Sequence, residues 1–324
     1  MEKASLILRD IYEAEKRIQP YIVRTPLLRC GTLDEVLGCE IYLKPEMLQV
    51  TGAFKMRGAT NKILSLTEEE RSKGIITSSS GNHGQACALA GRTIGIEATV
   101  VLPEDAPQIK INKVKAFGAK VLLGPRNYKE RMKIVRAEQE KHGYILAHAY
   151  EDYAVMAGQG TIALEILRDF PGIETILVPI GGGGLISGIS TAIKEINPKI
   201  RVIGVESEKC APYAESRKAG RKIEVEFLPT IADGLACREP GDHPYPIIEK
   251  YVDEIVTVDE EDIKTGMRLI ANHAKLIAEP SSSVGIAALL SKRIKLRPEE
   301  KVCCVLTSGN WDIDKIGKIL EETL

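Results

Sequence analysis

The stretch TILVPIGGGGLISGISTAIKEI, residues 175–196, joins a short apolar run to a helix-like segment through four consecutive glycines. The run TILVPI is rich in β-branched residues, as buried strands are. Consecutive glycines let the backbone adopt positive φ angles and bring several N–H groups close to one anion. The helix that follows adds the partial positive charge of its N-terminus. The stretch therefore predicts a strand, a phosphate-binding turn and a helix.

The glycine turn does not match the common nucleotide-binding motifs. Ile186 and Ser187 stand where the dinucleotide fingerprint requires its third glycine. The Gly-Lys-Ser/Thr of the Walker pattern is also missing. A purely structural turn rarely needs four glycines in a row. We therefore expect a phosphate that belongs to a different kind of ligand.

The pattern of short strand followed by helix repeats along the chain. From about residue 75 onward, β-branched runs alternate with amphipathic segments, which is typical of parallel sheets covered by helices on both faces. We expect an α/β fold with two open, twisted, mainly parallel sheets. Ligands of such sheets lie beyond the carboxyl ends of the strands, so the loops after strands are the candidate sites.

Composition excludes several classes of function. The 324 residues are 44% hydrophobic and 27% charged, which suits one large or two moderate globular domains. The net charge of −1 and the aromatic content of 5% give no basis for nucleic-acid binding. No apolar run reaches the roughly 20 residues that span a bilayer. We expect neither nucleic acid nor membrane as a partner.

Cysteine usage bears on the cellular compartment. The chain has seven cysteines, no CxxC pair and no signal-peptide core near its N-terminus. An odd number of thiols without a pairing pattern is typical of reduced, buried cysteines. The sequence therefore predicts a cytoplasmic localisation.

Two further strand-to-helix loops carry dense polar groups. TSSSGNHGQA, residues 77–86, combines three serines with Gly81, Asn82 and His83, and its main-chain N–H groups could hold a carboxylate. Helix capping alone would also explain it. LTSGNWD, residues 306–312, places the hydroxyls of Thr307 and Ser308 at the end of the last strand, where a simple hydroxyl turn is the alternative.

The stretch GAFKMRGA, residues 52–59, sets a lysine between small and apolar residues. Taken alone, Lys55 could be a solvated surface charge. If it is instead buried beside Phe54 and near the second cation Arg57, its pKa falls and its amine becomes a better nucleophile.

Taken together, these segments resemble one known family. The motifs that carry the resemblance are RTPLL (24–28), KPEMLQVTGAFKMRGA (44–59), SSGNHGQA (79–86), VMAGQGTIALEI (155–166), VPIGGGGLISGI (178–189), IADGLA (231–236) and SGNWD (308–312). In order and spacing they are similar to the fold-type-II pyridoxal-phosphate enzymes, in particular the branch of threonine/serine dehydratases and serine racemases. The resemblance implies a tryptophan synthase β-like fold.

The resemblance also implies how the chain divides. A large cofactor-binding domain would comprise residues 1–72 and 149–324, and a small mobile domain residues 73–148. The active site would lie in the cleft between them. The absence of sequence after the last helix suggests that no regulatory domain follows.

By this resemblance the cofactor is pyridoxal 5'-phosphate, and Lys55 forms a Schiff base with its aldehyde. Phe54 packs on the cofactor ring, Asn82 hydrogen-bonds its phenolic oxygen, and Thr307 faces its ring nitrogen. The residues expected to hold the phosphate are Gly181, Gly182, Gly183, Gly184 and Leu185. The residues expected to bind the substrate are Ser79, Ser80, Gly81, Asn82, His83 and Tyr150.

The ring-nitrogen partner departs from the family pattern. The family usually reads Ser-Gly-Gly-Asn, whereas this chain reads Thr307-Ser308-Gly309-Asn310. The partner is a neutral hydroxyl in either case. A neutral hydroxyl does not hold a proton on the ring nitrogen, so we expect a weaker electron sink that favours β-elimination over transamination.

The implied activity is conversion of L-threonine or L-serine to 2-oxobutanoate or pyruvate and ammonia. The substrate amine would displace Lys55, the freed lysine would take the α-proton, and the β-hydroxyl would leave. Two alternatives stay open within the family: a serine racemase, and a dehydratase of a 3-hydroxyaspartate-like substrate. Ser80 matches the second acid/base of racemases, whereas Tyr150 resembles the aromatic residue of many dehydratases.

Three further expectations complete the sequence-based hypothesis. The racemase metal site would use Glu206 and the carbonyl of Cys210, but Pro212 replaces the expected Asp, so the site for Mg²⁺ or another divalent cation is incomplete. Members of the family assemble as homodimers or homotetramers. An alternative from a different class is a non-catalytic module that binds a phosphate ligand, for which Lys55 would be dispensable.

Overall fold

A computed structural model of the chain describes residues 5–79, 81–226 and 228–321. The α-helices are α1 Leu8–Ile18, α2 Gly31–Leu37, α3 Lys55–Ser65, α4 Glu68–Lys73, α5 Asn82–Ile94, α6 Gln108–Ala116, α7 Tyr128–His142, α8 Tyr153–Asp169, α9 Gly184–Ile196, α10 Pro212–Ala219, α11 Pro244–Tyr251, α12 Glu260–Leu269, α13 Pro280–Leu290 and α14 Ile313–Glu321. The strands are β1 Leu28–Arg29, β2 Glu40–Pro45, β3 Ile75–Ser78, β4 Ala98–Pro103, β5 Lys120–Gly124, β6 Ile145–Leu146, β7 Thr175–Pro179, β8 Arg201–Ser207, β9 Glu254–Val258 and β10 Lys301–Leu306. Short turns of other helix types are η1 Gln19–Tyr21, η2 Glu46–Leu48, η3 Asp233–Leu235 and η4 Ile270–Ala274.

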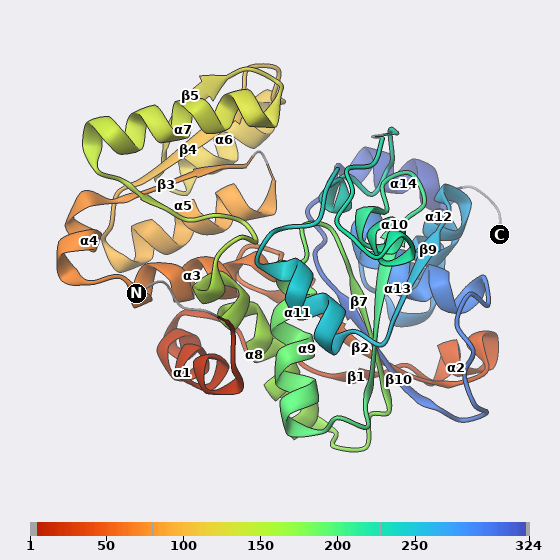
Figure 1. The fold of residues 1–324 in the computed structure, drawn as a ribbon. Coiled ribbons are helices and arrows are strands. Elements are labelled where there is room, and N and C mark those ends of the chain that lie inside the picture. Colours follow the sequence, from red (N-terminus) through yellow and green to blue (C-terminus); the bar gives the residue numbers. More distant parts are fainter. Residues whose placement is uncertain (1–4, 80, 227, 322–324) are drawn as a thin grey trace.

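The described strands form two separate sheets (Figure 1). The larger has the order β1-β2-β10-β7-β8-β9 and is parallel except for the short edge strand β1. The smaller has the order β5-β4-β3-β6 and is parallel throughout. The predicted α/β fold with two mainly parallel sheets is confirmed.

Helices cover both faces of the larger sheet because its strands are apolar on both sides. Along β7, Ile176 and Val178 pack into the core beneath α8 and α9, whereas Leu177 packs into the core beneath α12 and α13. The neighbouring Cys303 and Cys304 likewise face opposite cores, as the two-residue period of a strand requires. Both thiols are fully buried and belong to the packing.

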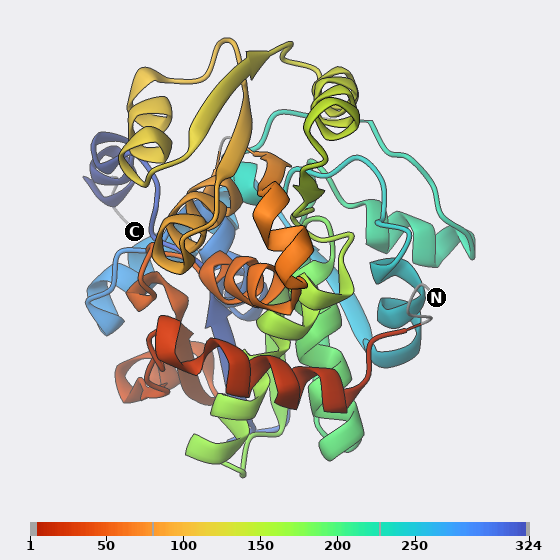
Figure 2. The same ribbon diagram turned by 90° about the vertical axis from the view of Figure 1, so that its left-hand side faces the viewer.

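The N-terminal region supplies parts of both halves of the molecule. Strand β2 pairs with β10, so residues near the two ends of the chain lie side by side in the larger sheet. Figure 2 shows α1 lying across α8 and α9, below the smaller sheet. Helix α3 packs against both α8 and α5, and its Met56, Ala59 and Ile63 join the core of the smaller sheet.

The strands of the smaller sheet fall within residues 75–146. This range lies inside the segment expected to form a small domain, although the exact boundary stays a prediction. None of the described helices is long and apolar enough to cross a membrane.

Candidate active site

The glycine turn connects β7 to α9 at the carboxyl end of the larger sheet. Gly183 has a φ of +90°, a conformation that favours glycine. A Cβ on Gly182 would overlap the ring of Tyr150, and one on Gly183 would overlap the hydroxyl of Tyr213. The turn therefore requires glycine for space as well as for backbone conformation.

The same turn presents backbone donors. The N–H of Ser187 bonds to the carbonyl of Gly183 at 3.0 Å, at the start of α9. The N–H groups of Gly184, Leu185 and Ile186 precede it and have no acceptor within the helix. An anion placed there would meet these donors and the positive end of the helix dipole.

Tyr213 supports the turn from behind, and the sequence analysis missed it. Its fully buried hydroxyl donates to the carbonyl of Gly182 at 2.9 Å and accepts from the N–H of Gly241 at 3.0 Å. Tyr213 lies outside every recognised motif, so no signal in the sequence marks it. Its role follows only from the fold, which brings α10 against the glycine turn.

Lys55 is the first residue of α3. Its Nζ donates to the carbonyl of Ala149 at 3.1 Å and lies 4.9 Å from the centre of the Phe54 ring. Burial lowers the pKa of Lys55 to about 8, as expected, although the thiols of Cys87 and Cys237 oppose the shift. Burial is the cause that was expected, whereas the second expected cause, the charge of Arg57, plays no part in the lowering.

The charge of Arg57 is neutralised by two carboxylates. Its guanidinium donates to Glu46 at 2.8 Å and to Glu165 at 2.7 Å, and all three side chains are buried. Lys44 adds a second cation, whose Nζ lies 2.6 Å from Glu165. We refer to Lys44, Glu46, Arg57 and Glu165 as the ion quartet.

Asn82 is the first residue of α5, and its amide is held in one orientation. Its Oδ1 accepts from Nδ2 of Asn310 at 2.9 Å, so its Nδ2 must be the group that donates. That Nδ2 lies 3.0 Å from Oγ of Ser308 and 3.3 Å from a carboxylate oxygen of Glu279. The Nδ2 end of Asn82 is therefore its donor, which a contact with a phenolic oxygen requires, and that contact stays a prediction.

Asn310, Ser308 and Glu279 were not assigned roles from the sequence. Ser308 Oγ donates to Glu279 at 2.7 Å, and Lys113 donates to Oδ1 of Asn310 at 3.1 Å. Burial raises the pKa of Glu279. Asn310 belongs to the quoted SGNWD motif, which could have marked it, whereas Glu279 joins the site only through the packing of α13.

Thr307 and Ser308 point in different directions. The hydroxyl of Thr307 lies 2.9 Å from Oγ of Ser282, whereas that of Ser308 turns toward Asn82 and Glu279. The backbone of this loop is tied to the lysine segment, because the N–H of Phe54 donates to the carbonyl of Thr307 at 3.0 Å. Thr307 is thereby placed next to the residue that precedes Lys55.

The serine-rich loop leads into α5. Oγ of Ser79 accepts from the N–H of Gly81 at 3.3 Å, and Ser80 lies outside the described residues. His83 is buried, and its Nε2 donates to the carbonyl of Ala147 at 2.8 Å. Burial lowers the pKa of His83 to about 3, so the ring is neutral, and its Nδ1 has no partner among the described residues.

Tyr150 lies against the glycine turn. Its ring packs on Gly182, its Cα and Cβ pack on Gly184, and its hydroxyl lies 3.8 Å from the sulfur of Cys237. The ring of His148 meets it edge-on at 4.6 Å. Tyr150 thus contacts the glycine turn and directly follows Ala149, the residue whose carbonyl accepts from Lys55. Its contact with substrate stays a prediction.

The residues predicted for a divalent cation are partly engaged in other contacts, and the cation site stays a prediction. Both carboxylate oxygens of the buried Glu206 accept backbone N–H groups at the start of α10, from Tyr213 at 3.1 Å and Ala214 at 2.8 Å. Pro212 contributes no side-chain oxygen where the family has an Asp, so the expected ligand set stays incomplete. The described part of the chain holds no cluster of three His, Cys, Asp or Glu side chains suited to a metal.

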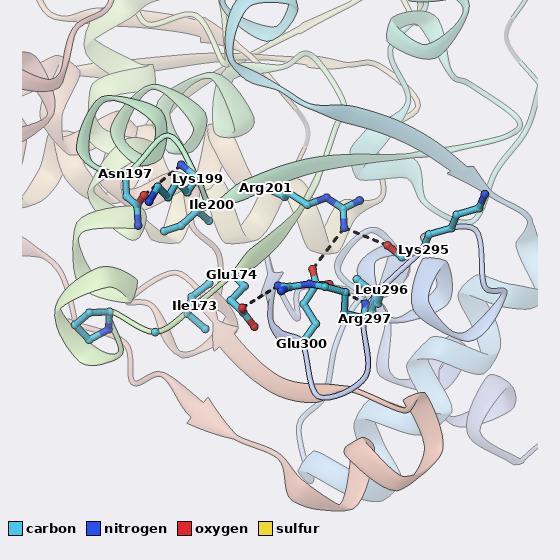
Figure 3. A pocket seen from close by; sticks show the side chains of 12 residues that line it. Ile173, Glu174, Asn197, Lys199, Ile200, Arg201, Lys295, Leu296, Arg297 and Glu300 are labelled. Atoms are coloured by element: carbon cyan, nitrogen blue, oxygen red, sulfur yellow. Dashed lines mark hydrogen bonds and ion pairs between the residues drawn. The ribbon is translucent and has the colours of Figure 1, made fainter.

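A pocket of about 660 Å³ lies at the opposite ends of the same strands, away from the glycine turn (Figure 3). It surrounds the starts of β7, β8 and β10. Arg201 and Arg297 donate there to Glu300 and Glu174 respectively. These ion pairs join the beginnings of the strands, and the pocket contains none of the residues predicted for the site.

The polar groups around Lys55 suit pyridoxal phosphate. The glycine turn offers N–H groups to a phosphate, Asn82 offers a donor to a phenolic oxygen, and Thr307 offers a hydroxyl to a ring nitrogen. Lys55 supplies an amine that no described carboxylate neutralises. These are the complementary groups for the phosphate, ring and aldehyde of that cofactor.

Comparison with known proteins agrees with this fit. The family described as "Pyridoxal-phosphate dependent enzyme" matches residues 18–308. The chain therefore belongs to the pyridoxal-phosphate dependent enzymes, in the branch of threonine dehydratases and serine racemases.

The relatives include both threonine dehydratases and a serine racemase. The chain is 45% identical to an L-threonine ammonia-lyase of Thermotoga maritima over 319 residues, which is 98% of this chain and 79% of the relative. It is 42% identical to the catabolic L-threonine dehydratase TdcB of Staphylococcus aureus, covering 98% of this chain and 92% of the relative. Among solved structures, the serine racemase of Dictyostelium discoideum superimposes with a TM-score of 0.90 at 40% identity, covering 95% of this chain and all of that one.

Proposed function

We propose that the protein is a pyridoxal-phosphate dependent ammonia-lyase that converts L-threonine, L-serine or both to the 2-oxo acid and ammonia. The observation that carries the proposal is the Lys55 amine, which is desolvated and has no carboxylate partner among the described residues. The identity of 45% to an L-threonine ammonia-lyase supports the same reaction class.

The cofactor, when bound, withdraws electrons from the α-carbon of an amino acid attached to it. The chain's own residues do the rest. Lys55, once released, takes the α-proton on its Nζ, because a pKa of about 8 leaves a share of the amine neutral at physiological pH. The N–H groups at the start of α5 hold the substrate carboxylate. The β-hydroxyl then leaves as water, and hydrolysis yields the 2-oxo acid and ammonia.

The direct test is to incubate the protein and pyridoxal phosphate with L-threonine, L-serine and L-threo-3-hydroxyaspartate separately. We expect 2-oxo acid and an equal amount of ammonia from threonine or serine. The third substrate tests the alternative dehydratase. A preparation that stays colourless with the cofactor and forms no 2-oxo acid would instead support a non-catalytic phosphate-binding module.

A second candidate is serine racemase, favoured by the structural likeness to the Dictyostelium enzyme at 40% identity. Ser80 is the residue proposed to act as the second acid/base. Under that proposal, Ser80→Ala abolishes formation of D-serine and spares formation of pyruvate. An equal loss of both products would contradict the role of Ser80. Because Pro212 replaces the Asp of the expected cation site, we expect neither product to depend on added Mg²⁺.

We further propose that the protein acts in the cytoplasm as a homodimer or homotetramer, with residues 73–148 moving as a small domain. Leu48, Val50 and Ile277 are about half exposed and supply apolar surface for association. Sedimentation equilibrium tests the assembly. Small-angle scattering with and without L-serine tests the domain movement.

A further inference from the structure

The pocket at the end of the larger sheet opposite to the glycine turn contains none of the residues assigned to the proposed reaction (Figure 3). Three loops form it, and each leads into a strand: residues 171–174 before β7, 197–200 before β8 and 295–300 before β10. Its volume of about 660 Å³ falls within the roughly 300–1,000 Å³ of small-molecule sites. The pocket is therefore large enough for a small organic ligand.

The two carboxylates that line the pocket are already engaged. Glu300 is buried and accepts the hydroxyl of Thr175 and, at 2.9 Å, the backbone N–H of Arg297. Glu174 accepts the N–H of Lys301 at 3.0 Å. Burial opposes ionisation of Glu300, but its hydrogen bonds outweigh burial and lower its pKa, and the N–H of Lys301 lowers the pKa of Glu174. Both side chains are therefore negative at neutral pH.

Two arginines neutralise these carboxylates. Arg297 donates to Glu174 at 2.8 Å, and Arg201 donates to Glu300 at 3.4 Å. Arg201 also pairs at 3.1 Å with Glu254, which does not line the pocket. Both guanidinium groups are thus held by carboxylates of the protein. They are not available for the two-bond arrangement in which arginine binds a ligand carboxylate.

Two lysines of the lining are left over. Lys199 and Lys295 lie on opposite sides of the arginine pairs (Figure 3). Both are exposed, and neither ammonium group forms an ion pair or a hydrogen bond within the described part of the chain. Four cations therefore face the three carboxylates Glu174, Glu254 and Glu300, which leaves one positive charge over, whereas the whole chain carries a net charge of −1.

Apolar side chains complete the lining. Pro171, Ile173, Ile200 and Leu296 come from the same three loops. A wall of this kind beside cations without partners suits a ligand that has both an anionic and an apolar part.

We propose that this pocket binds a small phosphate monoester, whose phosphate is attracted by Lys199 and Lys295 and whose organic part lies against the apolar wall. An ammonium group binds phosphate as a point charge on a flexible stem, whereas the arginine forks that select carboxylates are occupied. The five residues of β7, Thr175–Pro179, separate this pocket from the glycine turn by roughly 17 Å. The proposal is therefore independent of the proposed reaction.

The test is isothermal titration calorimetry with phenyl phosphate. The protein is loaded with pyridoxal phosphate and freed of excess cofactor beforehand, so that the glycine turn is occupied. We expect one phenyl phosphate per chain, and about tenfold weaker binding in the double variant Lys199→Gln/Lys295→Gln, because two attractive charges are lost. Inorganic phosphate, which lacks the apolar part, should bind the wild type more weakly than phenyl phosphate does.

The matched control is the double variant Lys120→Gln/Lys292→Gln. It removes two exposed lysine charges outside the pocket and should keep the wild-type affinity. All four lysines are exposed, so we expect both double variants to keep the fold, which circular dichroism checks.

Each outcome has a definite meaning. A wild-type protein that binds no phenyl phosphate at millimolar concentration overturns the proposal. Equal affinity of the wild type and Lys199→Gln/Lys295→Gln also overturns it, because the ligand then binds elsewhere. Equal weakening in the two double variants would show an effect of net charge alone and overturn it as well. Inorganic phosphate that binds as tightly as phenyl phosphate would overturn the part assigned to the apolar wall. Formation of 2-oxo acid by Lys199→Gln/Lys295→Gln should match the wild type, so failure of this site and failure of the proposed function are seen separately.

Discussion

Lys55 and Arg57 stand two residues apart on the first turn of α3, and their surroundings are opposite. Arg57 and the other members of the ion quartet pair two cations with two carboxylates at distances of 2.6–2.8 Å. Among the described residues, the Nζ of Lys55 hydrogen-bonds only to the carbonyl of Ala149, at 3.1 Å, and lies over the ring of Phe54. One helix therefore begins with a reactive amine and a fully neutralised guanidinium.

This difference shows how the fold separates structure from chemistry. A buried ion must be paired, or it shifts its pKa and loses its charge. The charges of the ion quartet are paired, and these residues join β2, α3 and α8 beneath the site. Lys55 is not paired with a described carboxylate, and its pKa is lowered instead. The pKa near 8 makes its amine available at physiological pH.

The largest expected effect comes from removing the unpaired amine. Lys55→Ala should lower 2-oxo acid formation by about 10⁴-fold or more, because it removes both the covalent attachment point and the proposed base. A steady-state assay with L-threonine measures this loss. Lys73→Ala is the control, since Lys73 forms only an exposed pair with Glu69. Equal activity of the Lys55 and Lys73 variants would contradict the proposed role.

Breaking the paired region should affect stability instead. Arg57→Met leaves the carboxylates of Glu46 and Glu165 buried with Lys44 as their only cation. Removing one partner of a buried ion pair costs about 3–5 kcal/mol, so we expect the free energy of unfolding to fall by that amount. Urea denaturation followed by circular dichroism measures it.

The exposed pair of Lys73 and Glu69 serves as the control for that experiment. Glu69→Gln should leave the denaturation midpoint unchanged, because surface ion pairs contribute little. A midpoint shift in Arg57→Met no larger than that in Glu69→Gln would mean that the ion quartet does not stabilise the fold.

The pH dependence of cofactor attachment tests the low pKa of Lys55. Only the neutral amine attacks an aldehyde, and the folded pKa of Lys55 lies near 8 instead of the ordinary 10.5. Below pH 8 the attachment rate should therefore rise about tenfold per pH unit, and it should level off above pH 8. Stopped-flow absorbance after mixing cofactor-free protein with pyridoxal phosphate records the rate. A rise that continues to pH 10 would show that Lys55 is not desolvated.

Much of this arrangement could be predicted from the sequence because local patterns carry it. The glycine turn, the motif around Lys55 and the loops at Asn82 and Thr307 are each short and contiguous, so the resemblance located them. The alternation of strands and helices also predicted two parallel sheets.

The parts that could not be predicted depend on contacts between distant segments. The pairing of β2 with β10, and the approach of Ser282 to Thr307, join residues that only the folded chain brings together. The expected contribution of Arg57 to the low Lys55 pKa failed for the same reason, because Glu165 neutralises Arg57 from more than a hundred residues away. The expected contribution of burial depends on local sequence and is present.

The smallest expected effect concerns the support of the glycine turn. Tyr213→Phe removes one hydroxyl and leaves the carbonyl of Gly182 and the N–H of Gly241 without this partner. A lost hydrogen bond of this kind is worth about 1 kcal/mol, so the dissociation constant for pyridoxal phosphate should rise about fivefold. Equilibrium titration of cofactor-free protein measures it. Tyr251→Phe, which removes a hydroxyl bonded to Glu195 on an exposed surface, should leave this affinity unchanged. Because Tyr213 is not among the causes of the low pKa of Lys55, the variant should also keep the pH midpoint near 8, and a shifted midpoint would show that the two residues are coupled.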